Sequence, residues 1–210
     1  MSSTTMSASR RRCVILDRDG TINVDCHYLS NPDQVELLPG ALPGLARMAA
    51  MGLGLVVVTN QSGLARGYFD AVRLRAIHAR LEALLAEGGV VLDGIFICPH
   101  HPGERCRCRK PEPALALEAA ALLGFDTGEA FVIGDRASDI ALGRHLGAFS
   151  ILVTNNDGRS VAAAPVVNAD AVVADLDEAA TVIERCLGRQ PSGTDRARGR
   201  QGGVTPPLPR

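Results

Sequence analysis

The stretch VILDRDGT, residues 14–21, decides the fold that this sequence predicts. Its apolar, partly β-branched beginning is typical of a buried strand, and its end carries Asp17 and Asp19 with one residue between them. Two carboxylates this close repel each other unless a cation or a proton lies between them. The following Gly20 permits a sharp turn in which backbone N–H groups face an anion. We therefore expect a strand that ends in a polar site.

Apolar runs of this kind recur along the chain and alternate with longer stretches rich in alanine and leucine. We expect strands over residues 14–17, 53–59, 94–98, 130–135, 150–154 and 171–175, and helices over residues 42–51, 71–87, 113–123, 137–146 and 176–187. Pro113 suits the first turn of one helix, and Gly52 and Gly124 lie where helices are expected to end. Apolar strands that alternate with helices predict an α/β fold, with a Rossmann-like parallel sheet flanked by helices on both faces.

The length of 210 residues corresponds to one folded domain. We expect this domain over residues 13–188, after a flexible N-terminus at residues 1–12. Glycine, proline and arginine are frequent in residues 189–210, and this composition predicts a disordered tail.

The composition also argues against several kinds of partner. A net charge of −1 and 3% aromatic residues do not fit a nucleic-acid binder or a phosphatase of nucleic-acid ends. No apolar run approaches the ~20 residues that span a bilayer, and the N-terminal arginines precede no signal-peptide segment. Six cysteines without such a signal fit a reducing compartment, where clustered thiols more often bind metal. We expect a cytoplasmic monomer that binds neither membranes nor nucleic acid.

Polar clusters follow two further expected strands. Residues 59–62 (TNQS) end the second, Asp135 and Asp139 follow the fourth, and Lys110 lies between these clusters in the sequence. Ligands of open α/β sheets bind outside the carboxyl ends of the strands. Each cluster alone fits a turn that caps a helix, and a calcium-binding EF-hand is excluded because its terminal glutamate and flanking helices are missing. Together, the acids, the hydroxyl and the lysine predict a magnesium-dependent phosphoryl-transfer site.

In this order, the clusters resemble the four motifs of the haloacid dehalogenase (HAD) superfamily of phosphatases, over about residues 14–148. The residues that carry the resemblance are Asp17-Arg18-Asp19-Gly20-Thr21, Thr59-Asn60, Lys110-Pro111 and Gly134-Asp135 with Asp139. By this resemblance, Asp139 would support the metal site or Lys110 rather than bind the metal itself.

The resemblance implies a role for each matching residue. Asp17 would be the nucleophile that forms an aspartyl-phosphate. Asp19 would protonate the leaving alkoxide and then activate water. Mg²⁺ would be bound by Asp17, by the backbone carbonyl of Asp19 and by Asp135. Thr59 and Lys110 would bind the phosphoryl oxygens.

The segments between these motifs are too short for the cap domain that many superfamily members carry. Residues 22–58 hold one loop and one helix, and residues 61–109 hold a helix, a strand and a loop rich in cysteine and histidine. A capless site should be open, so that short loops select the substrate. The two candidate loops are residues 23–28 and the loop that begins at Cys98.

That second loop has the ligands of a structural zinc site. Cys98, His100, Cys106 and Cys108 would supply three thiolates and one imidazole, a closed tetrahedral set. Reduced cysteines without metal are the alternative, and His101 competes with His100 as the ligand. A thioredoxin-like redox pair is disfavoured because Cys106 and Cys108 are separated by one residue rather than two.

A zinc loop directly before Arg109 and Lys110 is similar to two capless groups, the heptose-1,7-bisphosphate 7-phosphatases and the histidinol-phosphate phosphatases. Residues 17–23, Asp25 with Tyr28, residues 60–67 and residues 98–102 look like the heptose group. This resemblance implies a small phosphorylated sugar as substrate and loss of its 7-phosphate; the alternatives are histidinol-phosphate hydrolysis and a non-enzymatic zinc-loop binding module. The substrate contacts it implies are Asp25, Cys26, His27, Tyr28, Asn60, Gln61, Ser62, Arg109 and Arg136.

Overall fold

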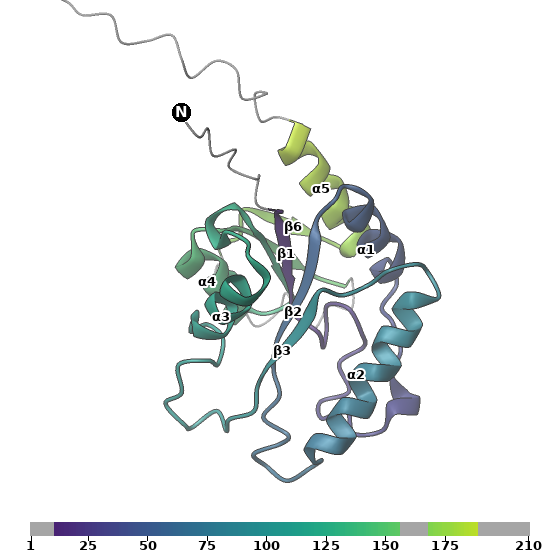
Figure 1. Cartoon of the computed structure of the whole chain (residues 1–210), viewed down its shortest axis with the longest axis vertical. Coiled ribbons are helices and arrows are strands. Elements are labelled where there is room, and N and C mark those ends of the chain that lie inside the picture. Colours follow the sequence, from purple (N-terminus) through teal and green to yellow (C-terminus); the bar gives the residue numbers. More distant parts are fainter. Residues whose placement is uncertain (1–10, 156–167, 189–210) are drawn as a thin grey trace, which may run out of the picture.

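The computed structural model describes residues 11–155 and 168–188, and Figure 1 shows one sheet between two sets of helices. Six parallel strands form the sheet in the order β3-β2-β1-β4-β5-β6. The strands are β1 (Cys13–Leu16), β2 (Gly54–Asn60), β3 (Gly94–Cys98), β4 (Phe131–Gly134), β5 (Phe149–Val153) and β6 (Ala171–Val173). All six predicted strands and their parallel arrangement are confirmed.

Helices cover both faces of the sheet, as predicted. They are α1 (Ala41–Ala50), α2 (Ala71–Ala86), α3 (Ala114–Leu123), α4 (Ala137–Leu146) and α5 (Leu176–Gly188). Buried side chains of α1, α2 and α5 share one apolar cluster, and those of α3 and α4 belong mainly to another. Two short 3-10 helices, η1 (Pro32–Gln34) and η2 (Thr127–Glu129), were not predicted, because three residues are too few to give a helical period.

Side chains of β1 alternate between the two clusters. Val14 and Leu16 pack with α1, α2 and α5, whereas Cys13 and Ile15 pack on the side of α3. Because both faces of the strand are buried, its sequence is apolar without interruption.

The sheet order places the end of β1 at a switch point. Leu16 pairs with Val57 of β2 on one side and with Ile133 of β4 on the other. The chain builds β2 and β3 outward from β1, then returns to build β4, β5 and β6 on the opposite side. Asp17, the next residue, therefore lies in the crevice where open α/β sheets bind ligands.

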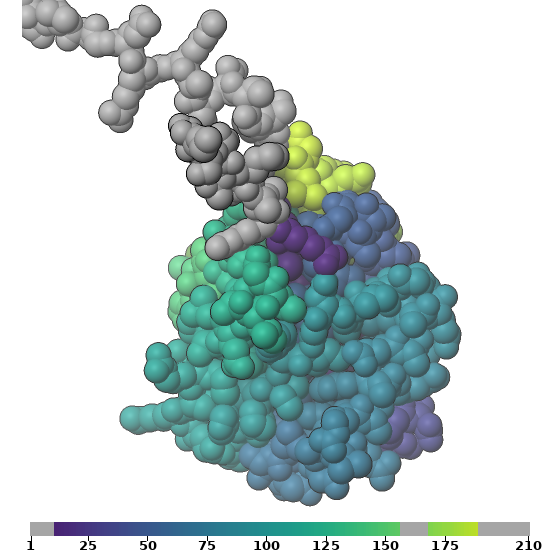
Figure 2. All heavy atoms as spheres, viewed as in Figure 1, coloured from purple at the N-terminus to yellow at the C-terminus, as the bar shows by residue number. Residues whose placement is uncertain are grey.

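No additional domain interrupts the chain near this crevice. The connection from β1 to β2 holds η1 and α1, and the one from β2 to β3 holds α2, both within the described range. In the space-filling view of Figure 2, the teal projections at the left edge belong to the connection from β3 to α3, which Figure 1 shows as a loop rather than a separate domain. The capless architecture is confirmed.

No helix among residues 11–155 and 168–188 is long and apolar enough to cross a bilayer. The predicted tail at residues 189–210 and most of the predicted flexible N-terminus lie outside the described residues.

Candidate active site

A cavity of about 350 Å³ opens beyond the ends of β1, β2 and β4. Of the predicted catalytic and substrate-binding residues, Asp17, Asp19, Asp25, His27, Tyr28, Thr59, Asn60, Gln61, Ser62, Arg109, Lys110 and Arg136 line it. Cys26 is exposed and is not among the lining residues. The reason is a tight turn, in which Tyr28 N donates to Cys26 O and His27 has a positive φ of 67°. The structure therefore gives no cavity contact to the predicted Cys26.

Lys110 joins two acids at the floor of the cavity. Its Nζ lies 2.8 Å from Asp17 Oδ1 and 2.7 Å from Asp139 Oδ1, and all three side chains are buried. Burial alone would lower the pKa of Lys110, but the charges of Asp139 and Asp17 outweigh burial and raise this pKa. Lys110 is therefore a fixed cation beside the predicted nucleophile.

Asp135 carries a negative charge that the described residues do not fully balance. Burial, followed by repulsion from Asp17 and Asp139, raises the pKa of Asp135 to about 7. Its Oδ1 is buried without a hydrogen-bond partner, and one carboxylate oxygen from each of these three acids lies within 4.8 Å of the others. Hard oxygen ligands with an excess of negative charge fit Mg²⁺.

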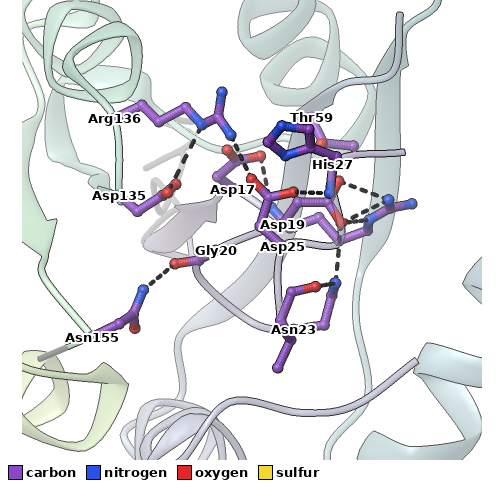
Figure 3. Close-up of polar contacts among 12 residues, drawn as sticks. Asp17, Asp19, Gly20, Asn23, Asp25, His27, Thr59, Asp135, Arg136 and Asn155 are labelled. Atoms are coloured by element: carbon purple, nitrogen blue, oxygen red, sulfur yellow. Dashed lines mark hydrogen bonds and ion pairs between the residues drawn. The ribbon is translucent and has the colours of Figure 1, made fainter. Parts of the chain in front are cut away.

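The turn at Gly20 depends on the absence of a side chain. A Cβ atom at this position would come within 2.4 Å of Asp135 Oδ2, and the backbone has a φ of 79°, which favours glycine. Behind the turn, Asn155 Nδ2 donates to Gly20 O at 2.6 Å, as Figure 3 shows. Gly20 thus lets the β1 end approach Asp135 closely.

Asp19 is held by side chains on several sides. Arg18 binds its two oxygens from Nη2 at 2.8 and 2.7 Å, Asn23 Nδ2 donates to Oδ1 at 3.0 Å, and Gln61 Nε2 donates to Oδ2 at 2.8 Å. Burial opposes ionisation, but Arg18 and the hydrogen bonds outweigh it and lower the pKa of Asp19. The described arrangement is therefore that of the carboxylate.

Sequence reasoning assigned no role to Arg18, and it placed Asn23 in a substrate loop without predicting its contact with Asp19. Alternation along an extended strand predicts that the residue between Asp17 and Asp19 points away from them. The chain turns at this point instead, and Ile22 N and Asn23 N both donate to Arg18 O. The only signal in the sequence was a cation between two acids.

Arg136 lies across the mouth of the site. Its Nη2 is 2.6 Å from Asp25 Oδ2, and its Nε is 3.8 Å from Asp135 Oδ2 (Figure 3). The ion pair joins the loop after β1 to the start of α4, two segments that the sequence predicted to contact substrate.

Asn60 has a contact that the sequence did not predict. Its Oδ1 accepts from Lys110 N at 3.0 Å and its Nδ2 donates to Lys110 O at 3.3 Å, so its amide fixes the backbone of the lysine. Arg109 has a buried Nη1 without a hydrogen-bond partner among the described residues. Nearby, Gln61 Nε2 donates to Thr59 Oγ1 at 3.1 Å, which orients the hydroxyl at the end of β2.

The four predicted zinc ligands converge in the loop between β3 and α3. Cys98 Sγ lies 3.6 Å from Cys106 Sγ, 3.3 Å from Cys108 Sγ and 3.6 Å from His100 Nδ1. Ligands at the usual Zn–S and Zn–N lengths stand about 3.5–3.8 Å apart in a tetrahedron. Two separations here are shorter, the 3.3 Å one and the 3.1 Å between His100 Nδ1 and Cys108 Sγ, but all four ligand atoms lie within 4.8 Å of one another and could hold one zinc ion. His101 is turned aside, because its Nδ1 accepts from Gly103 N at 3.1 Å. The structure thus places His100 rather than His101 in the cluster.

The chain is similar to known proteins in both sequence and structure. Residues 107–179 match a protein-family model described as HAD-hydrolase-like. The D-glycero-beta-D-manno-heptose-1,7-bisphosphate 7-phosphatase of Pasteurella multocida is 41% identical over 140 residues, covering 64% of this chain and 76% of the relative. The Bordetella bronchiseptica protein of the same name is 39% identical over 153 residues, covering 72% of this chain and 86% of the relative.

A solved structure gives the same result. The crystal structure of D,D-heptose 1,7-bisphosphate phosphatase from B. bronchiseptica, complexed with magnesium and phosphate, matches with a TM-score of 0.76 at 36% identity. The match covers 83% of this chain and 98% of that one. Of the two capless groups that the sequence resembles, these relatives carry the name of the first. The chain belongs to the HAD superfamily, in the family of D-glycero-D-manno-heptose-1,7-bisphosphate 7-phosphatases.

Proposed function

We propose that this chain hydrolyses the 7-phosphate of D-glycero-D-manno-heptose 1,7-bisphosphate and releases heptose 1-phosphate and inorganic phosphate. The observation that carries the proposal is the placement of Asp17 at the switch point of the sheet, 2.8 Å from the buried Lys110 ammonium and close to Asp135. A carboxylate nucleophile needs positive charge nearby so that it can approach a phosphate dianion. Lys110 supplies one such charge, and the neighbouring acids can bind a metal cation that supplies more.

In the first half of the reaction, Asp17 attacks the phosphorus of the 7-phosphate. A bond forms between its carboxylate oxygen and phosphorus, and the bond from phosphorus to the sugar oxygen breaks. Asp19, in its protonated form, donates a proton to the leaving alkoxide. Thr59 and Lys110 bind the equatorial oxygens of the transferring group, where negative charge is spread.

In the second half, Asp19 accepts a proton from water, and the resulting hydroxide attacks the phosphorus of the aspartyl-phosphate. This step regenerates Asp17 and releases inorganic phosphate. The carboxylate form of Asp19, to which Arg18, Asn23 and Gln61 donate, is the form that this step requires.

The two metal ions would have different tasks. The carboxylates of Asp17 and Asp135 and the backbone carbonyl of Asp19 would hold Mg²⁺, which when bound screens the repulsion between these acids and the phosphate. Cys98, His100, Cys106 and Cys108 would hold Zn²⁺ in a closed structural site. This second cluster fixes the loop that ends in Arg109 and Lys110.

Substrate contacts come from the cavity walls. Asp25, His27 and Tyr28 on one loop, Asn60, Gln61 and Ser62 after β2, and Arg109 and Arg136 would orient the sugar and its second phosphate. Arg109 supports this assignment because it brings a buried, unpartnered guanidinium nitrogen to the cavity. Cys26 is the predicted contact with the least support, since it does not line the cavity.

The test is a comparison of substrates. Purified protein with Mg²⁺ should hydrolyse the heptose bisphosphate with a higher kcat/KM than histidinol phosphate. A preference for histidinol phosphate would overturn the proposed substrate but not the phosphatase chemistry. Asp17→Asn should abolish both activities, whereas a non-enzymatic zinc-loop module would keep its function in this variant. The monomeric state, the cytoplasmic location and the absence of nucleic-acid binding stay predictions from the sequence.

A further inference from the structure

Arg18 is a fully buried cation that the reaction described above does not use. Its side chain is 1% exposed, and Nε and Nη2 both point to Asp19, at 3.1 Å and 2.8 Å from Oδ1. Its remaining terminal nitrogen, Nη1, lies 3.0 Å from Nε2 of His78. All three nitrogens of the guanidinium group therefore have a partner, and two of them donate hydrogen bonds to Asp19, the predicted acid–base residue.

His78 reaches this site from α2, 60 residues further along the chain. A guanidinium group can only donate, so His78 Nε2 must accept, and the imidazole is neutral with its proton on Nδ1. Burial, followed by the charge of Arg18, lowers the pKa of His78 to about 4, in agreement with this assignment. His78 is half-buried and lies beside Ile77, which packs in the sheet-facing core.

We propose that Arg18 and His78 are positioning residues that fix the carboxylate of Asp19 for the acid–base steps. The inference rests on the proposed function, because it concerns how Asp19 is oriented for it. A guanidinium group is planar, so the acceptor that binds its third nitrogen also fixes the plane in which the other two lie. His78 sets this plane and Arg18 transmits it to Asp19. Helix α2 is thereby connected to the catalytic turn after β1.

This arrangement predicts which steps of the reaction should slow when the contacts are lost. Among the described residues, Thr59 and Lys110, which would bind the phosphate, make no hydrogen bond or ion pair with Arg18 or His78. Loss of this chain of contacts should therefore leave phosphate binding nearly unchanged. The steps that need Asp19 should become slower. With p-nitrophenyl phosphate the leaving phenolate needs no proton, so formation of the aspartyl-phosphate should stay fast while its hydrolysis slows.

The experiment compares two substitutions of His78 with a control on the same helix. His78→Leu removes the acceptor, His78→Gln retains one, and Arg75→Leu changes an exposed position of α2. Rapid-quench measurements with p-nitrophenyl phosphate and Mg²⁺ would give the burst of nitrophenol and the steady-state rate for each protein. We expect His78→Leu to lower kcat and KM together by about tenfold, with an unchanged kcat/KM and a burst near one equivalent.

The remaining variants complete the test. His78→Gln should recover most of the lost kcat, Arg75→Leu should equal the wild type, and Arg18→Met should show the same pattern as His78→Leu with a larger loss. A purely structural effect would instead reduce the burst amplitude in proportion to the misfolded fraction. Equal rates for His78→Leu and Arg75→Leu, a smaller burst, or no recovery in His78→Gln would each overturn the inference. Wild-type turnover of p-nitrophenyl phosphate without turnover of the heptose bisphosphate would overturn only the proposed substrate.

Discussion

Lys110 Nζ lies 2.7 Å from Asp139 Oδ1, and both side chains are almost completely buried. Asp139 also accepts from the backbone N–H of Arg136 at 3.1 Å, so one carboxylate caps the first turn of α4 and anchors the lysine. The start of α4 therefore determines where the ammonium group stands relative to Asp17.

This relationship predicts the effect of Asp139→Asn. The amide cannot balance the buried ammonium, and breaking a buried ion pair costs about 3–5 kcal/mol in the free energy of unfolding. Asp17 still neutralises part of the charge, so we expect a loss near the lower end of this range and a fall in kcat of more than about tenfold. Urea unfolding and steady-state kinetics would measure both. Glu118→Gln, an exposed change on α3, is the control and should alter neither.

The raised pKa of Asp135 predicts that magnesium binding depends on pH. In the metal-free protein its pKa is raised to about 7, above the value near 3.9 of an unfolded chain. The stability that the protonated form contributes is therefore fully present below about pH 3.9 and is lost as the pH rises through 7. Mg²⁺ binds the ionised form, so it should raise Tm more at pH 8 than at pH 6.

Calorimetric titration would check this linkage directly. At pH 6, binding of Mg²⁺ should release close to one proton, and at pH 8 far less, because Asp135 is already ionised. Asp135→Asn should remove the binding at both values. Proton release that is equal at pH 6 and pH 8 would contradict the raised pKa of Asp135.

Arg136 and Asp25 predict a change in substrate affinity. Their 2.6 Å ion pair links two residues that line the cavity. The Arg136 side chain is 60% exposed, so it is free to turn toward a bound phosphate. Arg136→Ala should raise KM about tenfold or more with a smaller effect on kcat, since the reacting atoms lie deeper. Arg136→Lys should recover only part of this loss, because an ammonium group cannot make the paired contacts of a guanidinium. An unchanged KM in Arg136→Ala would exclude a role in binding.

Much of this site could be predicted because its residues follow strands. Asp17, Thr59 and Asp135 come directly after or at the end of apolar runs, and parallel strands bring such positions to one edge of the sheet. The cluster of three cysteines and one histidine could be predicted because its members lie within eleven residues of the chain, from Cys98 to Cys108.

The remaining contacts could not be predicted, because they depend on how the chain folds in space and not on the local sequence pattern. His78 lies on an amphipathic helix whose period gives its half-buried position but not the residue it faces. Strand β1 ends at Leu16, two residues before Arg18. Arg18 therefore does not follow the alternation of a strand, and its side chain can turn toward Asp19. Cys26 was assigned to the substrate with its neighbours, but the turn at His27 leaves it exposed.

The zinc cluster predicts a loss of activity without a loss of magnesium binding. Cys106→Ser should remove the bound zinc, loosen the loop that carries Lys110 and lower kcat, whereas Asp17 and Asp135 still offer their oxygens to Mg²⁺. His100→Ala should behave like Cys106→Ser, and His101→Ala should keep its zinc, because only His100 points into the cluster. Atomic emission would measure zinc, and calorimetry would measure Mg²⁺ affinity. Full activity in zinc-free Cys106→Ser would refute the structural role, and zinc loss in His101→Ala would assign the fourth ligand to the other histidine.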